Sequence, residues 1–266
     1  MTRLIRNLLI LLCAAQAVFA AGFLLQISAL TRLWPLPYTT PLSFIFIASI
    51  AFAAVASTLW CILTAELAGV AGIALDYILI FVPITIFMAQ LAGRGGSSGL
   101  TMFAVLCAAT AVLGLGLLAW SVRIPPRDVR PTPRLVRSAF AIFVIALIVA
   151  GGQMVLKNTG IMPWSISTEA TVIYGWMFLG AAAYFAYGIV RPGWYNAGGQ
   201  LAGFLAYDVV LIVPFVQRLP LVEPELRLNL IIYLVVLIAS GALAAYYLFV
   251  HAETRLWGRG KSAVSA

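Results

Sequence analysis

The apolar positions of this chain form eight long blocks that hold very few charged residues. The blocks cover residues 8–30, 42–63, 69–91, 99–120, 138–156, 170–190, 198–216 and 228–250. Each is close to the roughly 20 apolar residues with which a helix crosses a bilayer core of about 30 Å. Because the connections between the blocks are short, they leave no room for a soluble domain. The pattern predicts an all-α, polytopic membrane helix bundle with about eight transmembrane helices.

The overall composition supports the same fold class. Of the 266 residues, 64% are hydrophobic and 9% are charged, whereas about a quarter of a typical soluble domain is charged. The basic start "MTRLIRN" raises the question of a cleaved signal peptide. The apolar core of a signal peptide has about 7–15 residues, but this run continues past "VFA" through "AGFLLQISAL". We therefore interpret the first block as a retained helix.

The formal net charge of +8 is distributed unevenly between the two predicted sides of the membrane. With a cytoplasmic N-terminus, the basic residues on the inner side are Arg3, Arg6, Arg123, Arg127, Arg130, Arg134, Arg137, Arg191, Arg255, Arg259 and Lys261. Those on the outer side are Arg32, Arg94, Lys157, Arg218 and Arg227. An excess of Lys and Arg on the cytoplasmic side fixes the orientation of membrane helices. Both termini are therefore predicted to be cytoplasmic, and the charge does not indicate a nucleic-acid partner.

The longest predicted cytoplasmic connection carries the run "RIPPRDVRPTPR", which is rich in both proline and arginine. Arginines at this depth favour contact with anionic lipid headgroups, although docking of a soluble partner is an alternative use. The chain also contains fourteen arginines and two lysines, a bias typical of GC-rich bacterial genomes. The predicted location is therefore a bacterial cytoplasmic, or inner, membrane.

The residue types that usually hold cofactors are scarce and scattered. Cys13, Cys61 and Cys107 lie in three different blocks without a paired spacing, and His251 is the one histidine. This pattern contains no disulfide framework and no metal motif. Haem or a catalytic metal requires more histidine or clustered cysteine. No cofactor and no metal are therefore predicted.

The third and seventh blocks align with one another as copies. When Gly72 is placed over Gly203, Pro83 falls on Pro214, eleven residues later in both blocks. Between these positions "GIALDYILIFVP" faces "GFLAYDVVLIVP", with apolar residues matched at most positions. Four residues before each glycine, Ala68 aligns with Gly199. The resulting pairs of small residues allow close approach of membrane helices.

Weaker matches in the neighbouring blocks extend the alignment to the whole chain. We predict two parallel four-helix repeats, at residues 1–120 and 138–250, joined by the loop 121–137 and followed by a cytoplasmic tail at 251–266. Repeats with an even number of spans keep the same orientation and are related by an axis along the membrane normal. Chance similarity between apolar helices is the alternative.

Two aspartates, Asp76 and Asp208, are the only acids well inside the predicted spans, and no Lys or Arg accompanies them. An aspartate at a helix centre costs about 2.5–3.5 kcal/mol on insertion scales, which the surrounding apolar residues offset. Without a cation, burial favours the neutral acid, which still requires a hydrogen-bond partner.

The repeat suggests that partner. Asp76 aligns with Tyr207, and Tyr77 aligns with Asp208. Equivalent positions face one another across a two-fold axis. If the third and seventh spans are neighbours, two carboxyl–phenol hydrogen bonds form, from Asp76 to Tyr207 and from Tyr77 to Asp208. We refer to this hypothesis as the cross-repeat pair.

Transport is the first functional hypothesis for these acids. Acids inside a membrane are candidate sites by default, and duplicated transporters bind their substrates at the repeat interface. A small solute or ion would then meet Asp76 and Asp208 as proton or cation sites. Pro83 and Pro214 follow the acids by two turns and are candidates for breaking the helix and freeing carbonyls. Against transport, the intramembrane glutamines are scattered along the chain: Gln16, Gln26, Gln90, Gln153 and Gln200.

A non-catalytic structural or accessory subunit of a membrane complex is the alternative of about equal weight. In that case the acids only fix helix packing, and the many small residues pack internally or against a partner subunit. An enzyme is disfavoured. Two membrane aspartates, one within "YD", superficially resemble the intramembrane aspartyl proteases, but residues 73–76 read Ile-Ala-Leu-Asp where that family has Gly-x-Gly-Asp.

Overall fold

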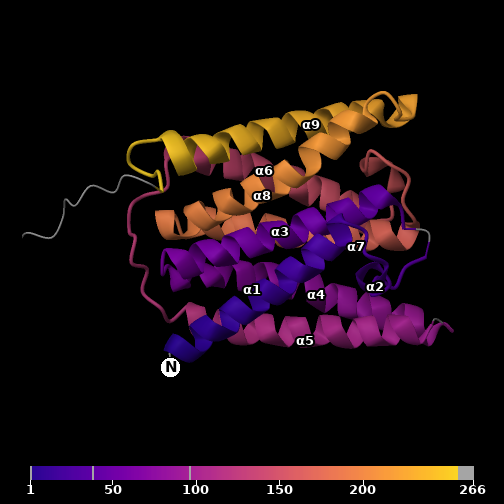
Figure 1. The fold of residues 1–266 in the computed structure, drawn as a ribbon, viewed down its shortest axis with the longest axis horizontal. Helices are drawn as coiled ribbons and strands as arrows, with labels where there is room; N and C mark the ends of the chain where they lie inside the picture. Colours follow the sequence, from indigo (N-terminus) through magenta and orange to yellow (C-terminus); the bar gives the residue numbers. More distant parts are fainter. Residues whose placement is uncertain (1, 38, 96, 257–266) are drawn as a thin grey trace, which may run out of the picture.

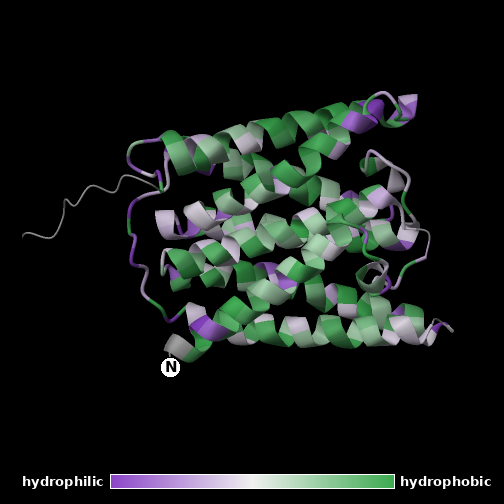
Figure 2. Ribbon diagram, viewed as in Figure 1, coloured by the Kyte–Doolittle hydropathy of each residue, from purple (hydrophilic) through white to green (hydrophobic). Residues whose placement is uncertain are grey.

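The structure is a bundle of long helices that lie roughly side by side (Figure 1). It is a computed structural model that describes residues 2–37, 39–95 and 97–256. Within these residues, eight helices are long and apolar enough to cross a membrane, and no strand is present. Figure 2 shows apolar residues along the helices and hydrophilic residues gathered mainly toward the two ends. The protein is therefore an all-α, multi-pass integral membrane protein.

The bounds of the helices follow the predicted blocks closely. The long helices are α1 (Thr2–Leu24), α3 (Pro41–Leu63), α4 (Val70–Gly93), α5 (Ser98–Ser121), α6 (Arg134–Val155), α7 (Thr168–Val190), α8 (Trp194–Arg218) and α9 (Pro224–Ala245). Short turns of helix lie between them: α2 (Ser28–Thr31), η1 (Leu67–Gly69) and η2 (Thr159–Ile161). A π-helical turn, η3 (Tyr246–Val250), continues α9.

The bounds of the first span were predicted wrongly. The apolar block runs over residues 8–30, but α1 starts at Thr2 and ends at Leu24. The helix stops because Gln26 adopts a left-handed backbone conformation with a φ of 51°, which interrupts helical hydrogen bonding. Apolar character therefore continues into α2, on the far side of a turn, without continuing the helix.

Aromatic residues and prolines cluster before α3, at residues 33–40, and before α7, at residues 162–167, and each cluster contains a helix cap. The Thr40 hydroxyl accepts a hydrogen bond from the backbone N–H of Ser43 at 3.3 Å. The Ser167 hydroxyl accepts one from the N–H of Ala170 at 3.1 Å. Each cap satisfies a helix N–H that has no partner within the helix itself, so these two clusters fix where the spans begin.

The eight spans form two rows of four. One row runs α5, α4, α7, α6, and the other runs α1, α3, α8, α9, each helix packing against the next in its row. The two rows lie one behind the other in Figure 1. Helices from the N-terminal and C-terminal halves meet at the middle of each row, where α4 packs on α7 and α3 on α8.

Glycines allow these middle contacts to be close. A Cβ added at Gly72 on α4 would lie 2.9 Å from the ring of Tyr184 on α7, and one at Gly203 on α8 would lie 2.6 Å from the hydroxyl of Ser57 on α3. The other two predicted close-packing residues differ from one another. A Cβ added at Gly199 would lie 3.4 Å from the ring of Trp60 on α3. Ala68 is buried in η1, ahead of α4.

The loop at residues 121–137 lies at the same end of the bundle as the start of α1 and the end of α9 (Figure 1). Its backbone is held by both halves of the chain. The N–H of Arg127 donates to the Glu66 carboxylate at 3.0 Å, and the Arg130 carbonyl accepts from the N–H of Trp194 at 2.8 Å. Arg123, Arg127, Arg134 and Arg137 are exposed. The tail at 251–266 is described as far as Leu256, and Arg259 and Lys261 lie outside the described residues.

Candidate functional site

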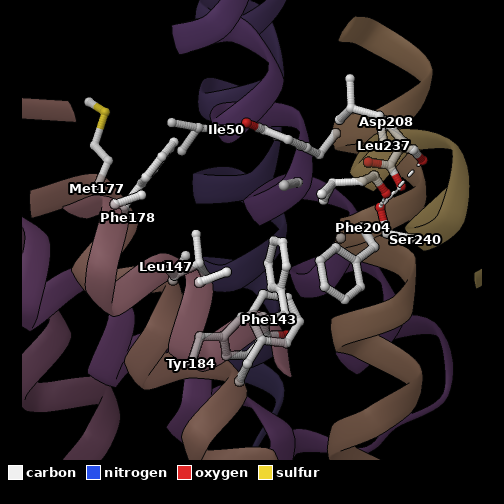
Figure 3. Close-up of a pocket in the computed structure, with 18 of the residues that line it drawn as sticks. Ile50, Phe143, Leu147, Met177, Phe178, Tyr184, Phe204, Asp208, Leu237 and Ser240 are labelled. Atoms are coloured by element: carbon white, nitrogen blue, oxygen red, sulfur yellow. Dashed lines mark hydrogen bonds between the residues drawn. The ribbon is translucent and has the colours of Figure 1, made fainter. Parts of the chain in front are cut away.

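A cavity of about 680 Å³ lies between the two rows and reaches both intramembrane aspartates. Its lining comes from α3, α4, α6, α7, α8 and α9, with η2 at one end. Apolar side chains such as Ile50, Leu147, Phe178 and Leu237 form most of the wall (Figure 3). The volume falls in the range of about 300–1,000 Å³ that is typical of ligand sites. Asp76 and Asp208 therefore line the same cavity.

Asp208 is held by α9 through Ser240, as the dashed line in Figure 3 shows. The Ser240 hydroxyl lies 2.9 Å from Asp208 Oδ2 and 2.7 Å from the Val236 carbonyl oxygen. A serine hydroxyl has one hydrogen to donate. Ser240 therefore donates to only one of these oxygens at a time, and both contacts are full hydrogen bonds only with a proton on Asp208 Oδ2.

The second oxygen of Asp208 has no such support. Asp208 is 1% exposed, and its Oδ1 has no hydrogen-bond partner in the described part of the chain. A buried polar atom without a partner costs about 1–3 kcal/mol. Gly241 allows α9 to approach this carboxyl, since a Cβ there would lie 3.3 Å from Oδ2.

Asp76 projects from α4 toward α7. A Cβ added at Gly180 of α7 would overlap the Ile80 side chain and lie 2.7 Å from Asp76 Oδ1, so the glycine leaves room for both side chains in this arrangement. Oδ1 is buried and, among residues 2–37, 39–95 and 97–256, has no hydrogen-bond partner. The Asp76 carboxyl lines the same cavity as Asp208, from the opposite row.

The cross-repeat pair does not form. Tyr77 donates its hydroxyl hydrogen to Gln16 Oε1 of α1 at 2.9 Å, and the Tyr207 hydroxyl pairs with that of Tyr233 on α9. The prediction fails because α4 and α8 lie in different rows. Each packs on a helix of the other half, α4 on α7 and α8 on α3, so the spans that carry the acids are not neighbours.

Gln200 is a cavity residue that the sequence pattern did not single out. It is fully buried, and its Nε2 donates to the Tyr184 carbonyl at 2.6 Å. Because the Tyr184 carbonyl can only accept, the Gln200 amide places its nitrogen toward Tyr184 and its oxygen away from it. Oε1 then has no partner among the described residues. Gln16 and Gln200 look scattered in sequence, but Gln16 accepts a hydrogen bond from Tyr77, and Gln200 lines the cavity.

Different contacts border the two ends of the cavity. Toward the end that holds the 121–137 loop, Phe143, Phe185 and Phe204 form a cluster, with Phe185 and Phe204 stacked at 4.3 Å and Phe143 and Phe204 at 4.6 Å between centroids. At the opposite end, the Asn229 side chain of α9 donates to the Gly160 carbonyl of η2 at 2.6 Å. Aromatic packing thus borders one end, while a hydrogen bond crosses the other.

The side of the cavity between α6 and α9 is open. These two helices end their rows and, over their described residues, do not pack along one another. Cavity-lining residues from both helices are exposed near the middle of their spans: Val149 is 61% exposed and Ile232 is 54% exposed. In a membrane this level is occupied by hydrocarbon. The opening therefore faces the bilayer core.

The two prolines do not break their helices. Pro83 lies inside α4, and Pro214 lies inside α8. The helices therefore continue through both positions. Each proline still lacks an N–H, so the carbonyl four residues before it loses its helical donor.

No group of three or more His, Cys, Asp or Glu residues is placed to hold a metal ion within the described residues. The three cysteines are free and buried. The polar groups that the cavity offers are therefore carboxyl, carboxamide and hydroxyl groups. They can bind a proton, a cation or a hydrogen-bond donor. No protein-family model, curated protein or solved structure matches this chain.

Proposed function

We propose that this protein is a transporter of a small solute or ion, with Asp76 and Asp208 as its proton or cation sites. The observation that carries the proposal is the single cavity lined by both aspartates. An intramembrane acid without a cationic partner is expensive to keep. Here each acid presents a buried oxygen without a hydrogen-bond partner in the described chain. Such oxygens are the groups that a bound cation or donor would satisfy.

We further propose that the chain is built from two parallel four-span repeats. The packing pairs support this, since each contact in one half has a counterpart in the other. α1 packs on α3 as α6 packs on α7, and α4 on α5 as α8 on α9. Between the halves, α4 packs on α7 as α8 packs on α3. A two-fold axis between the rows would generate this set of pairs.

Individual residues repeat in the same way. Thr40 caps α3 as Ser167 caps α7. Gly114 of α5 lies against Tyr77, with 3.3 Å between the added Cβ and that of Tyr77. Gly241 of α9 lies against Asp208, with a corresponding distance of 3.4 Å. Tyr77 and Asp208 are the residues that the alignment pairs, which supports a duplicated origin of the site.

In the proposed mechanism, the neutral Asp208 exchanges its proton for a cation: the proton leaves to the aqueous phase as the cation binds. The cation then occupies the side of the carboxyl that faces the cavity, and Ser240 turns its hydrogen to the carboxylate. Binding and proton release are thereby coupled, because opposite charges attract strongly in an apolar environment.

The excess of inner arginines supports cytoplasmic termini and an inner-membrane location in a bacterium.

Uptake into proteoliposomes under an imposed pH gradient tests this proposal. A panel of radiolabelled alkylammonium ions serves as substrates. We expect gradient-driven uptake of at least one ion. Asp76→Asn or Asp208→Asn should reduce the uptake rate about tenfold or more, which corresponds to a transport barrier higher by about 1.4 kcal/mol. Glu225→Gln, an acid-to-amide change on the exposed first turn of α9, is the matched control.

A structural or accessory subunit is the second candidate, favoured by the hydrogen bonds that tie helices together. Ser240 joins α9 to Asp208 of α8, and Gln16 joins α1 to Tyr77 of α4. If folded protein moves none of the ions faster than protein-free liposomes, the transport proposal is wrong. The bonds would then be packing devices, and the accessory role would be the remaining explanation.

A further inference from the structure

Among the residues that line the cavity, the polar side-chain atoms without a hydrogen-bond partner in the described chain are all oxygens. Asp76 Oδ1, Gln200 Oε1 and Asp208 Oδ1 are buried oxygens without a hydrogen-bond partner in the described chain. The described chain also contains buried donors without a partner, such as the Trp34 and Trp60 indole nitrogens, but none of them belongs to a residue that lines the cavity. A ligand that completes the site therefore brings hydrogen-bond donors, since a donor placed opposite a donor would leave both unsatisfied.

The rest of the wall selects an apolar body. Most of the lining is aliphatic or aromatic, including Ile50, Leu147 and Phe178, and Gln200 and Asp208 stand eight residues apart on α8. Eight residues of helix span about 12 Å. Polar atoms this far apart, with apolar surface between them, do not suit a small hydrated ion. They suit an elongated molecule with an apolar chain and a donor group.

The position of the opening selects the route of entry. The cavity opens between α6 and α9 at the level of Ala146, Val149 and Ile232, which are exposed residues near the middle of the two spans. The Phe143–Phe204 cluster and the Asn229–Gly160 bond narrow its two ends. A molecule that partitions into the bilayer reaches the acids through this side opening without first crossing an aqueous vestibule.

We propose that the cavity binds an amphiphilic amine that enters from the bilayer between α6 and α9. The neutral amine takes the proton of the Asp208 or Asp76 carboxyl, and the ammonium group so formed donates a hydrogen bond to the carboxylate. Its apolar chain lies along the wall. This inference names the substrate class of the proposed transporter, so the amine is a substrate only if the proposed function holds. The binding itself can be tested without transport.

The test uses dicyclohexylcarbodiimide, an apolar reagent that adds to protonated carboxyl groups and forms a stable N-acylurea. Protein in phosphatidylcholine nanodiscs is treated, and labelling of Asp76 and Asp208 is followed by peptide mass spectrometry. N,N-dimethyldodecylamine is the probe, because its ammonium form has an N–H donor and its tertiary nitrogen forms no amide. Dodecyl methyl ether, with a similar chain and no donor, is the matched ligand.

We expect both aspartates to react with the apolar reagent, and at least about tenfold faster than with a water-soluble carbodiimide. The amine should slow labelling about tenfold, which corresponds to about 1.4 kcal/mol, at a concentration where the ether has no effect. Ala146→Trp, which fills the side opening, should slow labelling without any ligand. Ala109→Trp, at an exposed position of α5 away from the cavity, should not.

Three results would overturn the inference. Equal labelling by the two carbodiimides would mean an aqueous route, equal protection by the ether would mean an acyl-chain groove, and absence of labelling would mean a closed cavity. The wild-type comparisons need no variant, so poor folding of Ala146→Trp does not remove the test. Protection by the amine without any ion uptake would refute transport alone, whereas uptake without protection would refute only this substrate class.

Discussion

At the scale of single residues, the chemistry of this protein rests on a few polar atoms placed among apolar neighbours. Asp208 is bound on one oxygen by Ser240 and has no described partner on the other, and Asp76 lies against Gly180, which has no side chain. A hydrogen bond within a membrane protein contributes about 0.6 kcal/mol on average. The acids are therefore not held by strong bonds, and their protonation state decides what each can do.

Asp208→Asn tests that protonation state through stability. The Asn amide can donate to Ser240 as a protonated carboxyl does, so we expect the free energy of unfolding to fall by less than about 0.5 kcal/mol, below the average for one such bond. Ser240→Ala removes the bond and should cost about 0.6–1.7 kcal/mol. Unfolding by SDS in mixed micelles measures both. A larger loss for Asp208→Asn than for Ser240→Ala would indicate a charged carboxylate in the resting protein.

Gly180→Ala tests the fit of Asp76. The added methyl group would overlap Ile80 and approach Asp76 Oδ1 to 2.7 Å. Overpacking of this kind costs about 1–3 kcal/mol, which the same unfolding assay would detect. Gly116→Ala on α5 is the control, because a Cβ there meets nothing within 4 Å. Its higher helix propensity should stabilise the protein by up to about 1 kcal/mol, and a similar loss at both positions would contradict the argument.

At the scale of elements, the ends of the rows differ from their middles. The middle helices α3, α4, α7 and α8 each pack against two helices of their row. The end helices α6 and α9 each pack against one, and the cavity is open between them. α9 is connected to the α6–α7 segment by the Asn229 side chain, which donates to the Gly160 carbonyl. The position of α9 therefore depends on few contacts outside α8.

Asn229→Ala should loosen this connection. Without the bond to Gly160, the backbone of η2 and the first turn of α9 lose a tertiary contact, and local opening becomes easier. We expect faster hydrogen–deuterium exchange over residues 156–166, with no change in the middle of α3. Thr110→Val on the exposed face of α5, whose hydroxyl bonds only within its own helix at 2.9 Å, is the control. Unchanged exchange in η2 would show that Asn229 does not hold this end of the cavity.

At the scale of the whole molecule, the loop at 121–137 joins the two halves at one end of the bundle. Glu66 accepts from its backbone, and the start of α8 donates to it. Charge distribution predicts that this end is cytoplasmic. The exposed arginines of the loop would then lie at the level of anionic lipid headgroups, each adding about 1 kcal/mol of attraction.

Reporter fusions test the orientation. Green fluorescent protein attached after Ala266 should fluoresce, because it folds in the cytoplasm. Alkaline phosphatase inserted at Asn158, between α6 and α7, should be active, because it requires the oxidising side of the membrane. The reverse pattern would place the 121–137 loop outside and would remove the argument for headgroup contact.

Hydropathy along the chain was enough to predict a membrane protein, the number of its spans and most of their bounds, because length and apolarity decide whether a helix crosses a bilayer. The same reading identified Asp76 and Asp208 as residues that need an explanation. It placed the end of α1 wrongly, since the left-handed conformation of Gln26 leaves no mark in hydropathy. The predicted partners of the acids were wrong as well.

Which helices are neighbours was decided by tertiary packing alone. In a membrane every long helix is apolar on all sides, so hydropathy does not distinguish a face that meets lipid from one that meets protein. The arrangement in two rows separates α4 from α8, directs Tyr77 to Gln16 and Tyr207 to Tyr233, and brings Gln200 to the cavity. The common cavity of the two aspartates follows from that arrangement, because contacts between distant segments of the chain create it.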